Sequence, residues 1–317
     1  MELHQLQMLR ELGELGSVKA VADTLRVTPS AVSQQISLLQ RQVATPLTRK
    51  DGRNLVLTEA GKVLADAAAQ VTDAMAAARA AIGTYEHDAG GTVTLSGFHS
   101  AGQALFAPLV RRLAGMRDSP APGAGAVPAL RISDEDVAQQ DFPALTARYD
   151  LVLAHRMDHS PAWPESRVRV IPLAHEPLDI AVAEDHPLAA KASLSPSDVV
   201  AYPWVASRSG YSPADVLTAI GAVTSCPVNV VHRINDYSAA AALVSTGELI
   251  GLLPRYTSSP ALAPGAALNP GVVLRPLTGI NTRRRIDLLA RPENLKRASV
   301  MLVAQALQEV MAELTAQ

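Results

Sequence analysis

Aromatic residues and cysteine are both scarce in this chain of 317 residues. Aromatics make up 3% of it, so its cores must be built from Ala, Val, Leu and Ile. Cys226 is the one cysteine, which excludes an intrachain disulfide and a redox switch made of two thiols of one chain. A lone thiol suits a reducing compartment, and the N-terminus lacks the pattern of a signal peptide, so we expect a cytoplasmic protein.

The sequence also lacks a long hydrophobic run and a global excess of basic charge. Without a run of about 18 apolar residues, no membrane span is expected. The net charge of -2 excludes a protein coated in basic surface, so any contact with nucleic acid must come from a local patch. Hydrophobic residues make up 48% of the chain, and its length predicts two or three folding units with sizeable cores.

The first 60 residues predict three helices joined by short turns. Leucines at near-helical spacing indicate a first helix, which Gly13 and Gly16 are expected to end. Ser17 is placed to cap a second helix that runs to Leu25. A short turn then leads into a third helix. Two helices joined in this way place a recognition helix in the major groove of DNA.

The third predicted helix has a surface suited to reading DNA. Thr28 is its expected cap and Pro29 its first residue, where a missing N–H costs nothing. Its outward positions include Ser30, Ser33 and Gln34. Gln pairs bidentately with adenine and Ser bonds base edges or phosphates, whereas a solvated helix face more often carries charges. We therefore predict that these three side chains contact DNA.

A short hairpin after the third helix completes a basic patch. Asp51-Gly52 is a turn signal between two strand-like runs. Across the turn, the third helix and the hairpin, five basic residues face one acid, which gives a local net charge of +4. An arginine-tipped hairpin beside a recognition helix predicts a wing whose Arg53 contacts phosphates or the minor groove. Arg49 and Lys50 are either further DNA contacts or solvated charges.

Residues 59–86 predict one long, alanine-rich helix capped by Thr58. Its apolar stripe has no partner within the first domain, which indicates a dimerising linker helix; a buried helix of the next domain is the alternative. From residue 92 onward strands alternate with helices, with two strand candidates within 171–183. This alternation predicts mostly parallel sheets with crossover helices in two lobes.

Motifs along the chain carry a resemblance to a known family. A Gly-Ser pair precedes the second helix and is followed by Ala-x-x-Leu-x-Val-Thr, Ala-x-Ser-x-Gln-Ile, Pro-Leu, Arg and Leu-Thr-x-Ala-Gly. Looser matches follow in HEPLDIAVAEDHPLA, SDVVAYPWVAS, DYSAAAALVSTGELIGLLP and VVLRPL. In these motifs the sequence resembles the LysR-type transcriptional regulators over nearly its whole length. Two departures are Thr48, where the family usually has Phe, and a longer Pro/Gly/Ala-rich link at 119–128.

The resemblance implies a winged helix-turn-helix (all-α with a small β wing), a long linker helix and a two-lobed α/β effector domain like that of periplasmic binding proteins. Their expected bounds are 1–58, 59–88 and 89–317, with the first lobe at about 92–169 and 273–317 and the second at about 170–272. Thr28 and Pro29, like Ser30, Ser33 and Gln34, match the family's DNA-contacting positions.

The same resemblance implies the partners. We expect a homodimer that pairs into a homotetramer, an imperfect palindrome in double-stranded promoter DNA, and a small-molecule effector between the lobes. RNA polymerase is a further expected partner if the protein is an activator. No cofactor is expected. The sequence shows no nucleophile elbow, phosphate-binding loop or carboxylate cluster, so no enzyme is predicted.

Candidate effector contacts lie at strand ends, where α/β lobes bind ligands close to helix N-termini. They are His99, Ser100, Ala101, His155, Ser207 and Asp236. Ser100 is placed to hold a ligand carboxylate or merely to cap a helix, and Asp236 either touches the ligand or caps the helix at Ser238. The cation Arg208 beside Ser207 is compatible with an anionic effector.

Alternatives to an effector-controlled regulator follow from the same residues. His155 and His159 have the spacing of a metal site on a helix, but Asp158 and Pro161 indicate a loop, so no metal site is predicted. A solute-binding module would need an export signal and leaves the first 60 residues unexplained. An enzyme would need a catalytic constellation, and a regulator that senses nothing would have its cleft filled by side chains.

Overall fold

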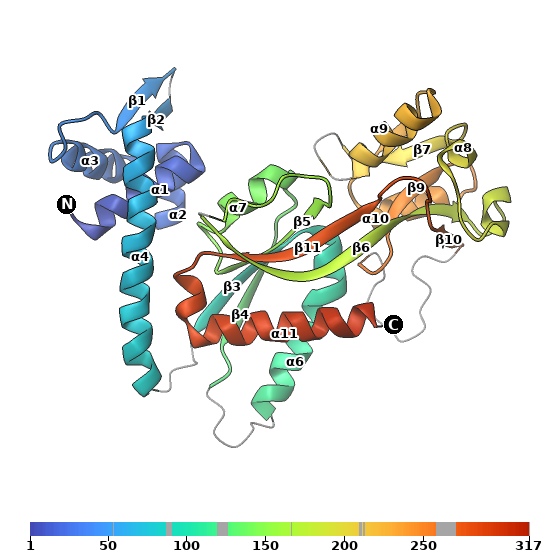
Figure 1. Ribbon diagram of the computed structural model, residues 1–317. Helices are drawn as coiled ribbons and strands as arrows, with labels where there is room; N and C mark the ends of the chain where they lie inside the picture. Colours follow the sequence, from blue (N-terminus) through green and yellow to red (C-terminus); the bar gives the residue numbers. More distant parts are fainter. Residues whose placement is uncertain are drawn as a thin grey trace.

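A computed structural model describes residues 1–52, 54–86, 91–118, 126–165, 167–208, 211, 213–257 and 271–316. Figure 1 shows a small helical domain with a hairpin, one long helix, and a larger two-lobed α/β domain. This is the fold class that the sequence predicts.

Short helices and a hairpin form the N-terminal domain, and one long helix leaves from it. The elements are α1 (Leu3–Leu15), α2 (Val18–Leu25), α3 (Pro29–Gln40), β1 (Thr48–Asp51), β2 (Asn54–Leu57) and α4 (Glu59–Glu86). The side chains of Ser17 and Thr28 accept hydrogen bonds from the N–H groups of Ala20 and Ala31, so both predicted caps are confirmed.

Gly13 does not end the first helix, contrary to our expectation. A Cβ on Gly13 would lie 2.7 Å from Cδ1 of Leu57, so the glycine lets the hairpin pack against α1. α1 ends at Gly16, whose φ of +71° favours glycine. Gly61 admits an even closer approach, because a Cβ there would lie 2.0 Å from the carbonyl oxygen of Leu47.

The second domain alternates strands with helices. Its elements are β3 (Thr92–Gly97), α5 (His99–Ala101), a π-helical turn (Gly102–Phe106), α6 (Ala107–Asp118), β4 (Ala129–Asp134), α7 (Phe142–Leu145), β5 (Leu151–Met157), β6 (Arg169–Ala183), α8 (Pro196–Val199), β7 (Pro203–Ala206), α9 (Pro213–Thr224), β8 (Asn229–Arg233), α10 (Tyr237–Val244), β9 (Ile250–Pro254), β10 (Val272–Arg275), β11 (Arg283–Ala290) and α11 (Ala298–Thr315). Short 3-10 turns lie at Gln139–Asp141, Pro187–Ala190 and Asn294–Lys296.

One sheet runs through both lobes in the order β4-β3-β5-β11-β6-β9-β7-β8, with β10 beside β6. β3 pairs in parallel with β4 and β5, and β7 pairs in parallel with β8 and β9. Between these groups, β6 and β11 run antiparallel to their neighbours. The sheet is therefore mixed, whereas the alternation of strands and helices predicted mostly parallel pairing. The alternation of strands and helices does not reveal β6 and β11, because along these strands the chain passes between the lobes without an intervening helix.

The two strand candidates within 171–183 form one continuous strand, β6. It pairs with β11 as far as Pro177 and with β9 from Leu178 onward. β6 and β11 thus run side by side from the first lobe towards the second, as Figure 1 shows.

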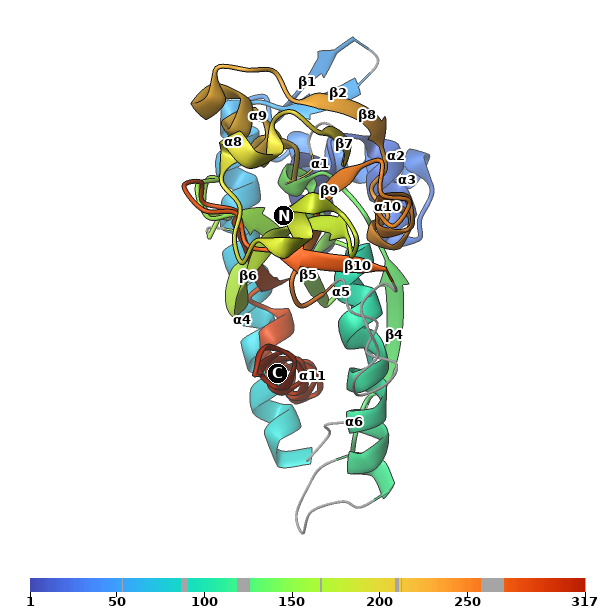
Figure 2. The same cartoon turned by 90° about the vertical axis from the view of Figure 1, so that its right-hand side faces the viewer.

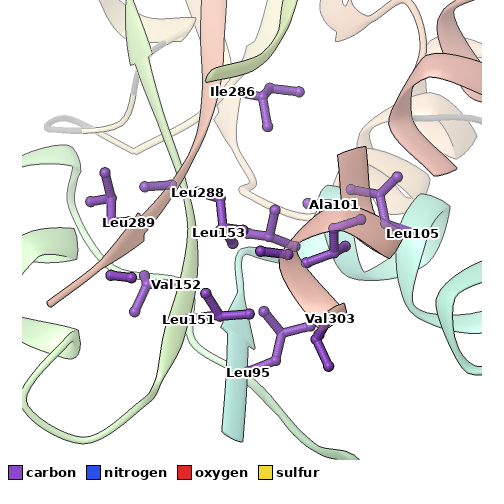
Figure 3. Close-up of a cluster of buried hydrophobic side chains, with 14 of the residues drawn as sticks. Leu95, Ala101, Leu105, Leu151, Val152, Leu153, Ile286, Leu288, Leu289 and Val303 are labelled. Atoms are coloured by element: carbon purple, nitrogen blue, oxygen red, sulfur yellow. The ribbon is translucent and has the colours of Figure 1, made fainter. Parts of the chain in front are cut away.

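Each lobe has an apolar core of its own. In Figure 3 aliphatic side chains of β3, β5, β11 and α11 meet, among them Leu95, Leu153, Leu288 and Val303. A second core surrounds Trp204 in the other lobe. Figure 2 shows α6 and α11 on the same side of the molecule, below the second lobe.

Candidate DNA-binding surface and effector cleft

Helix α3 has one apolar and one polar face. The apolar face packs into the core of the N-terminal domain. Ser30, Ser33 and Gln34 lie on the exposed face, and their side chains have no hydrogen-bond partner among the described residues. Thr28 and Pro29 are exposed at the N-terminus of the helix. The face predicted to contact DNA is therefore presented to solvent on an anchored helix.

Gln40 holds the chain that joins α3 to the hairpin. Its Nε2 donates to the carbonyl oxygens of Val43 and Thr45, both at 3.1 Å, and its Oε1 accepts from the N–H of Leu47 at 2.7 Å. These bonds fix the hairpin relative to the recognition helix. Gln40 was not predicted from the sequence, because no local pattern shows a side chain that bonds backbone groups up to seven residues away.

The hairpin closes with Asp51 opposite Asn54, which confirms the predicted wing. Arg49 and Lys50 are exposed on it. Arg49 lies 3.7 Å from the carboxylate of Asp51, in an exposed pair of the kind that adds little stability. Arg53 lies outside the described residues, so its DNA contact stays a prediction.

The floor of the cleft is a buried ionic network of Ser100, Glu176, Thr257 and Arg284, here called the cleft floor. Arg284 donates to Glu176 Oε2 from Nε at 2.9 Å and from Nη2 at 2.8 Å, and Nη2 also donates to the hydroxyls of Ser100 and Thr257. Arg284 is 1% exposed and Glu176 is fully buried. The hydroxyl of Ser100 therefore accepts a hydrogen bond within the cleft floor, and its contact with an effector stays a prediction.

His99 and Asp236 bridge the two lobes at the mouth of the cleft. His99 Nε2 lies 2.6 Å from Asp236 Oδ2, and its Nδ1 lies 3.6 Å from Asp134 Oδ2. Asp236 also caps α10, since its Oδ1 accepts from the N–H of Ala239 at 2.7 Å. The helix cap that the sequence allowed for Asp236 is therefore confirmed, and its contact with an effector stays a prediction.

His155 is buried beside the cleft floor. Its ring lies edge-on to the rings of Phe98 and Phe142, with centroids 4.5 and 5.2 Å away. Burial, and then the charge of Arg284, hold the pKa of His155 well below 6.5. The imidazole is therefore neutral at physiological pH.

Ser207 and Ala101 differ in what they offer a ligand. The hydroxyl of Ser207 is buried and has no hydrogen-bond partner among the described residues. Ala101 is buried within the first-lobe core, as Figure 3 shows. A methyl group enclosed in this way offers no polar contact, so an effector would reach only its backbone.

Four of the six candidate residues line a small hollow of about 20 Å³, whereas Ala101 and Asp236 do not. Its lining is Phe98, His99, Ser100, Asp136, His155, Ser207, Tyr211, Asn235, Tyr237 and Arg284. A volume of about 10–15 Å³ holds one water, so in this state the cleft has room for little more. The lobes are in direct contact around it, with Asn235 Nδ2 at 3.4 Å from Asp136 Oδ2 and Tyr211 Oη at 3.2 Å from the Asp136 carbonyl oxygen.

Asp136 and Asn235 also line the cleft, although neither was predicted from the sequence. Asp136 follows β4 and Asn235 follows β8, each two residues after the strand ends. The rule that ligands bind at strand ends would therefore have predicted both residues. Burial raises the pKa of Asp136, against a hydrogen bond from Asn235 and with the repulsion of Asp134. Arg284 gave no such signal, because it lies near the start of an antiparallel strand.

A second buried ionic group joins the N-terminal domain to the first lobe. It consists of Arg10, Glu11, Glu14, Arg291 and Glu293, here called the interdomain cluster. Arg291 bonds both carboxylate oxygens of Glu11, at 2.5 and 2.8 Å, and Glu14 at 2.6 Å. Arg10 bonds Glu293 at 2.6 Å and Glu14 at 3.1 Å. A hollow of about 290 Å³ adjoins this cluster, larger than the one in the cleft.

No described group of three or more His, Cys, Asp or Glu side chains is arranged to hold a metal ion. Among the helices that the structure describes, none is long and apolar enough to span a membrane.

The fold and the exposed face of α3 define a helix-turn-helix regulator with a two-lobed α/β domain. Comparison with family models agrees. Residues 3–62 match the model described as "Bacterial regulatory helix-turn-helix protein, lysR family", and residues 86–312 match "LysR substrate binding domain". The chain belongs to the LysR family of DNA-binding transcriptional regulators.

Curated relatives are distant but extend over most of the chain. A "Probable RuBisCO transcriptional regulator" of Synechocystis is 23% identical over 309 residues, which cover 96% of this chain and 85% of that protein. The protein of the same description from Trichormus variabilis is 22% identical and covers 93% of this chain and 84% of its own length.

Solved structures share the fold. A full-length OxyR variant from Pseudomonas aeruginosa has a TM-score of 0.65 at 17% identity and covers 98% of this chain and 94% of its own. CbnR, described as full-length and complexed with its target DNA, has a TM-score of 0.51 at 16% identity and covers 98% of this chain and 100% of its own. These likenesses concern the fold alone.

Proposed function

We propose that this regulator reads double-stranded promoter DNA through α3 and its wing. The proposed contacts are Thr28, Pro29, Ser30, Ser33, Gln34 and Arg53. The observation that carries the proposal is the exposed, unpartnered polar face of α3 beside a basic hairpin. Base edges are read by Gln and Ser, while arginine in the wing bonds phosphates, so specificity and affinity come from different residues.

Regulation would come from a small-molecule effector between the lobes. The candidate contacts are His99, Ser100, Ala101, His155, Ser207 and Asp236. An effector would replace the hydrogen bonds that now join the lobes, and it acts only as far as it binds one state of the protein more tightly than the other. The buried, unpartnered hydroxyl of Ser207 supports a ligand that forms a hydrogen bond there.

A regulator that senses nothing is the second candidate, because the hollow in the cleft is so small. Thermal unfolding in a library of metabolites separates the two. A compound that raises the unfolding temperature in wild type but not in Ser207→Ala supports the effector. No shift from any compound favours the self-filled cleft.

The assembly that we propose is a dimer joined through α4, paired into a tetramer on an imperfect palindrome. Val63, Val71, Met75 and Ile82 expose apolar side chains along α4. A second copy of the chain would cover them. We propose RNA polymerase as a further partner if the protein activates transcription. We further propose that the protein needs no cofactor, catalyses no reaction and works in the cytoplasm.

The experiment is a gel shift on the DNA upstream of the protein's own gene, across a salt series. The test variant is Ser33→Ala with Gln34→Ala, and the control is Gln305→Ala on α11. Losing a bidentate base contact costs about 1–3 kcal/mol, so specific binding should weaken by about 5- to 150-fold while random-DNA binding and its salt slope hardly change. An equal loss on both DNAs would place these side chains outside base recognition.

A further inference from the structure

Two arginines near opposite ends of β11, Arg284 and Arg291, serve different parts of the molecule. Arg284 is the second residue of β11 and lies in the cleft floor, while Arg291 follows its last residue and contacts α1. They are seven positions apart along an extended chain, a separation of about 24 Å. β11 pairs with β5 on one side and with β6 on the other, so it moves only with the sheet.

The geometry of the interdomain cluster fixes the direction of α1. A bidentate guanidinium–carboxylate pair is directional as well as strong. Arg291 holds Glu11 in this way and also bonds Glu14, almost one turn further along α1. Arg10 returns a bond from α1 to Glu293. Bonds at three points of α1 constrain the helix both along its axis and around it.

The direction of α1 is also the direction of the recognition helix. α1 and α3 share one apolar core. Polar bonds add to it, since Gln35 of α3 accepts from Gln5 at 3.3 Å and lies 2.9 Å from the ring of His4. If α1 changes its position on the first lobe, α3 therefore moves with it. The face of α3 that reads DNA then points in a different direction.

The interdomain cluster contains strong hydrogen bonds, but its charges are not balanced and some of its polar atoms have no partner. Three carboxylates face two guanidinium groups, and Arg10 Nη2, Arg291 Nε and Glu293 Oε2 have no hydrogen-bond partner among the described residues. Burying ions costs nearly as much as their attraction returns. A contact of this kind holds one geometry well and still separates readily, as a movable joint requires.

We propose that Arg291, through Glu11 and Glu14, is the residue that positions the DNA-binding domain on the first lobe, and that β11 couples this contact to the cleft floor. Entry of an effector shifts the intact cleft floor as one unit, the sheet carries the shift along β11, and α3 turns relative to α3 of the partner copy. The coupling to the cleft rests on the proposed function, whereas the positioning by Arg291 does not.

The test measures the preference of the full-length protein for the spacing between two half-sites. The probes are duplexes with two copies of the half-site that the wild type selects from random DNA, at spacings that differ by about half a helical turn, and a duplex with one copy. Arg291→Met and Glu11→Gln should keep their affinity for the single half-site within about twofold. Their preference among spacings should flatten by about tenfold, because α3 is intact but no longer held.

Arg255→Met is the matched control, since Arg255 forms a similar bidentate pair with Asp179 away from the N-terminal domain. It should keep the wild-type spacing preference. Wild-type preference in both Arg291→Met and Glu11→Gln would overturn the proposal. So would an equal loss on the single half-site, because the residues would then support the domain's fold. If Arg291→Met does not fold, Arg291→Lys, which keeps the charge but loses the bidentate geometry, takes its place.

The coupling along β11 is tested by combining Arg284→Lys with Arg291→Met. Substitutions about 24 Å apart act independently when nothing links them, so their fold-changes should then multiply. We expect Arg284→Lys to flatten the spacing preference alone and to add nothing in the Arg291→Met background. Multiplying effects would overturn the coupling. If the wild-type protein selects no specific half-site from random DNA, that result would instead contradict the proposed function.

Discussion

The cleft floor and the interdomain cluster, which lie near opposite ends of β11, consist of similar residues. They differ in how fully their polar atoms are hydrogen-bonded. In the cleft floor, Glu176 accepts hydrogen bonds from Arg284, from the Thr257 hydroxyl and from the N–H groups of Tyr256 and Thr257. Each described side chain of the floor has its partners. The interdomain cluster instead leaves three polar atoms unpaired and carries an excess carboxylate.

The difference matches what each group joins. The floor connects β6, β11 and the first helical turn of the effector domain, so opening it would expose a buried charge within one folded unit. The interdomain cluster connects two units, and its ions regain water when those units separate. The degree to which the buried polar atoms are hydrogen-bonded therefore distinguishes a permanent ionic core from a contact that can open.

The largest effect that we predict is the loss of stability in Arg284→Ala. The substitution leaves Glu176 buried without its counter-ion, which costs about 3–5 kcal/mol. Both tryptophans, Trp163 and Trp204, lie in the effector domain, so urea unfolding followed by their fluorescence reports on that domain. The double variant Arg284→Met with Glu176→Met should cost much less, because no charge stays buried. A cost below about 1 kcal/mol for Arg284→Ala would contradict a fully bonded floor.

A smaller effect is predicted for Arg291→Met in the same measurement. Burial alone would lower the pKa of Arg291, but its hydrogen bonds and the charges of Glu11, Glu14 and Glu293 raise it, so the guanidinium is fully charged in the contact. When it is replaced, the domains separate and the carboxylates regain water. The effector domain should therefore lose clearly less than the cost of about 3–5 kcal/mol expected for Arg284→Ala. A cost as large as that of Arg284→Ala would remove the distinction between the two groups.

The N-terminal domain was the part most predictable from sequence, because its signals are local. Thr28 with Pro29 begins α3, and Asp51-Gly52 turns the hairpin, within a few residues of the structure they specify. The resemblance to a family then supplied the two lobes. Gly13 misled us because a glycine that admits a neighbouring side chain looks the same in sequence as one that ends a helix.

Neither ionic group was predictable in this way. Glu176 and Arg284 are 108 residues apart, and Glu11 and Arg291 are 280 apart, so no periodicity or turn signal connects them. In the cleft, the strand-end rule brought His99 and Ser207 to the hollow that the structure contains. It does not show that the lobes fill the cleft with their own side chains, since that depends on packing between distant segments.

The smallest effect that we predict is a difference in pH dependence between the two regions. The pKa of His155 is lowered from 6.5 by burial and by Arg284, so its contribution to stability is complete above about pH 6.5 and is lost as the pH falls through the lowered value. Glu11 has the opposite sign. Burial raises its pKa above 4.5, so its contribution is complete below that value and is lost as the pH rises through the folded pKa.

Acidification from about pH 7.5 to 5.5 should therefore destabilise the effector domain through His155 without weakening the contribution of Glu11. The variant His155→Phe, which keeps a ring between Phe98 and Phe142, should show a shallower loss than wild type in urea unfolding. Some loss remains, because burial also lowers the pKa of His186. The control is His159→Gln on the surface, which should follow wild type. Equal slopes for wild type and His155→Phe would mean that His155 titrates as it does in the unfolded chain, and the cleft would then be open to water.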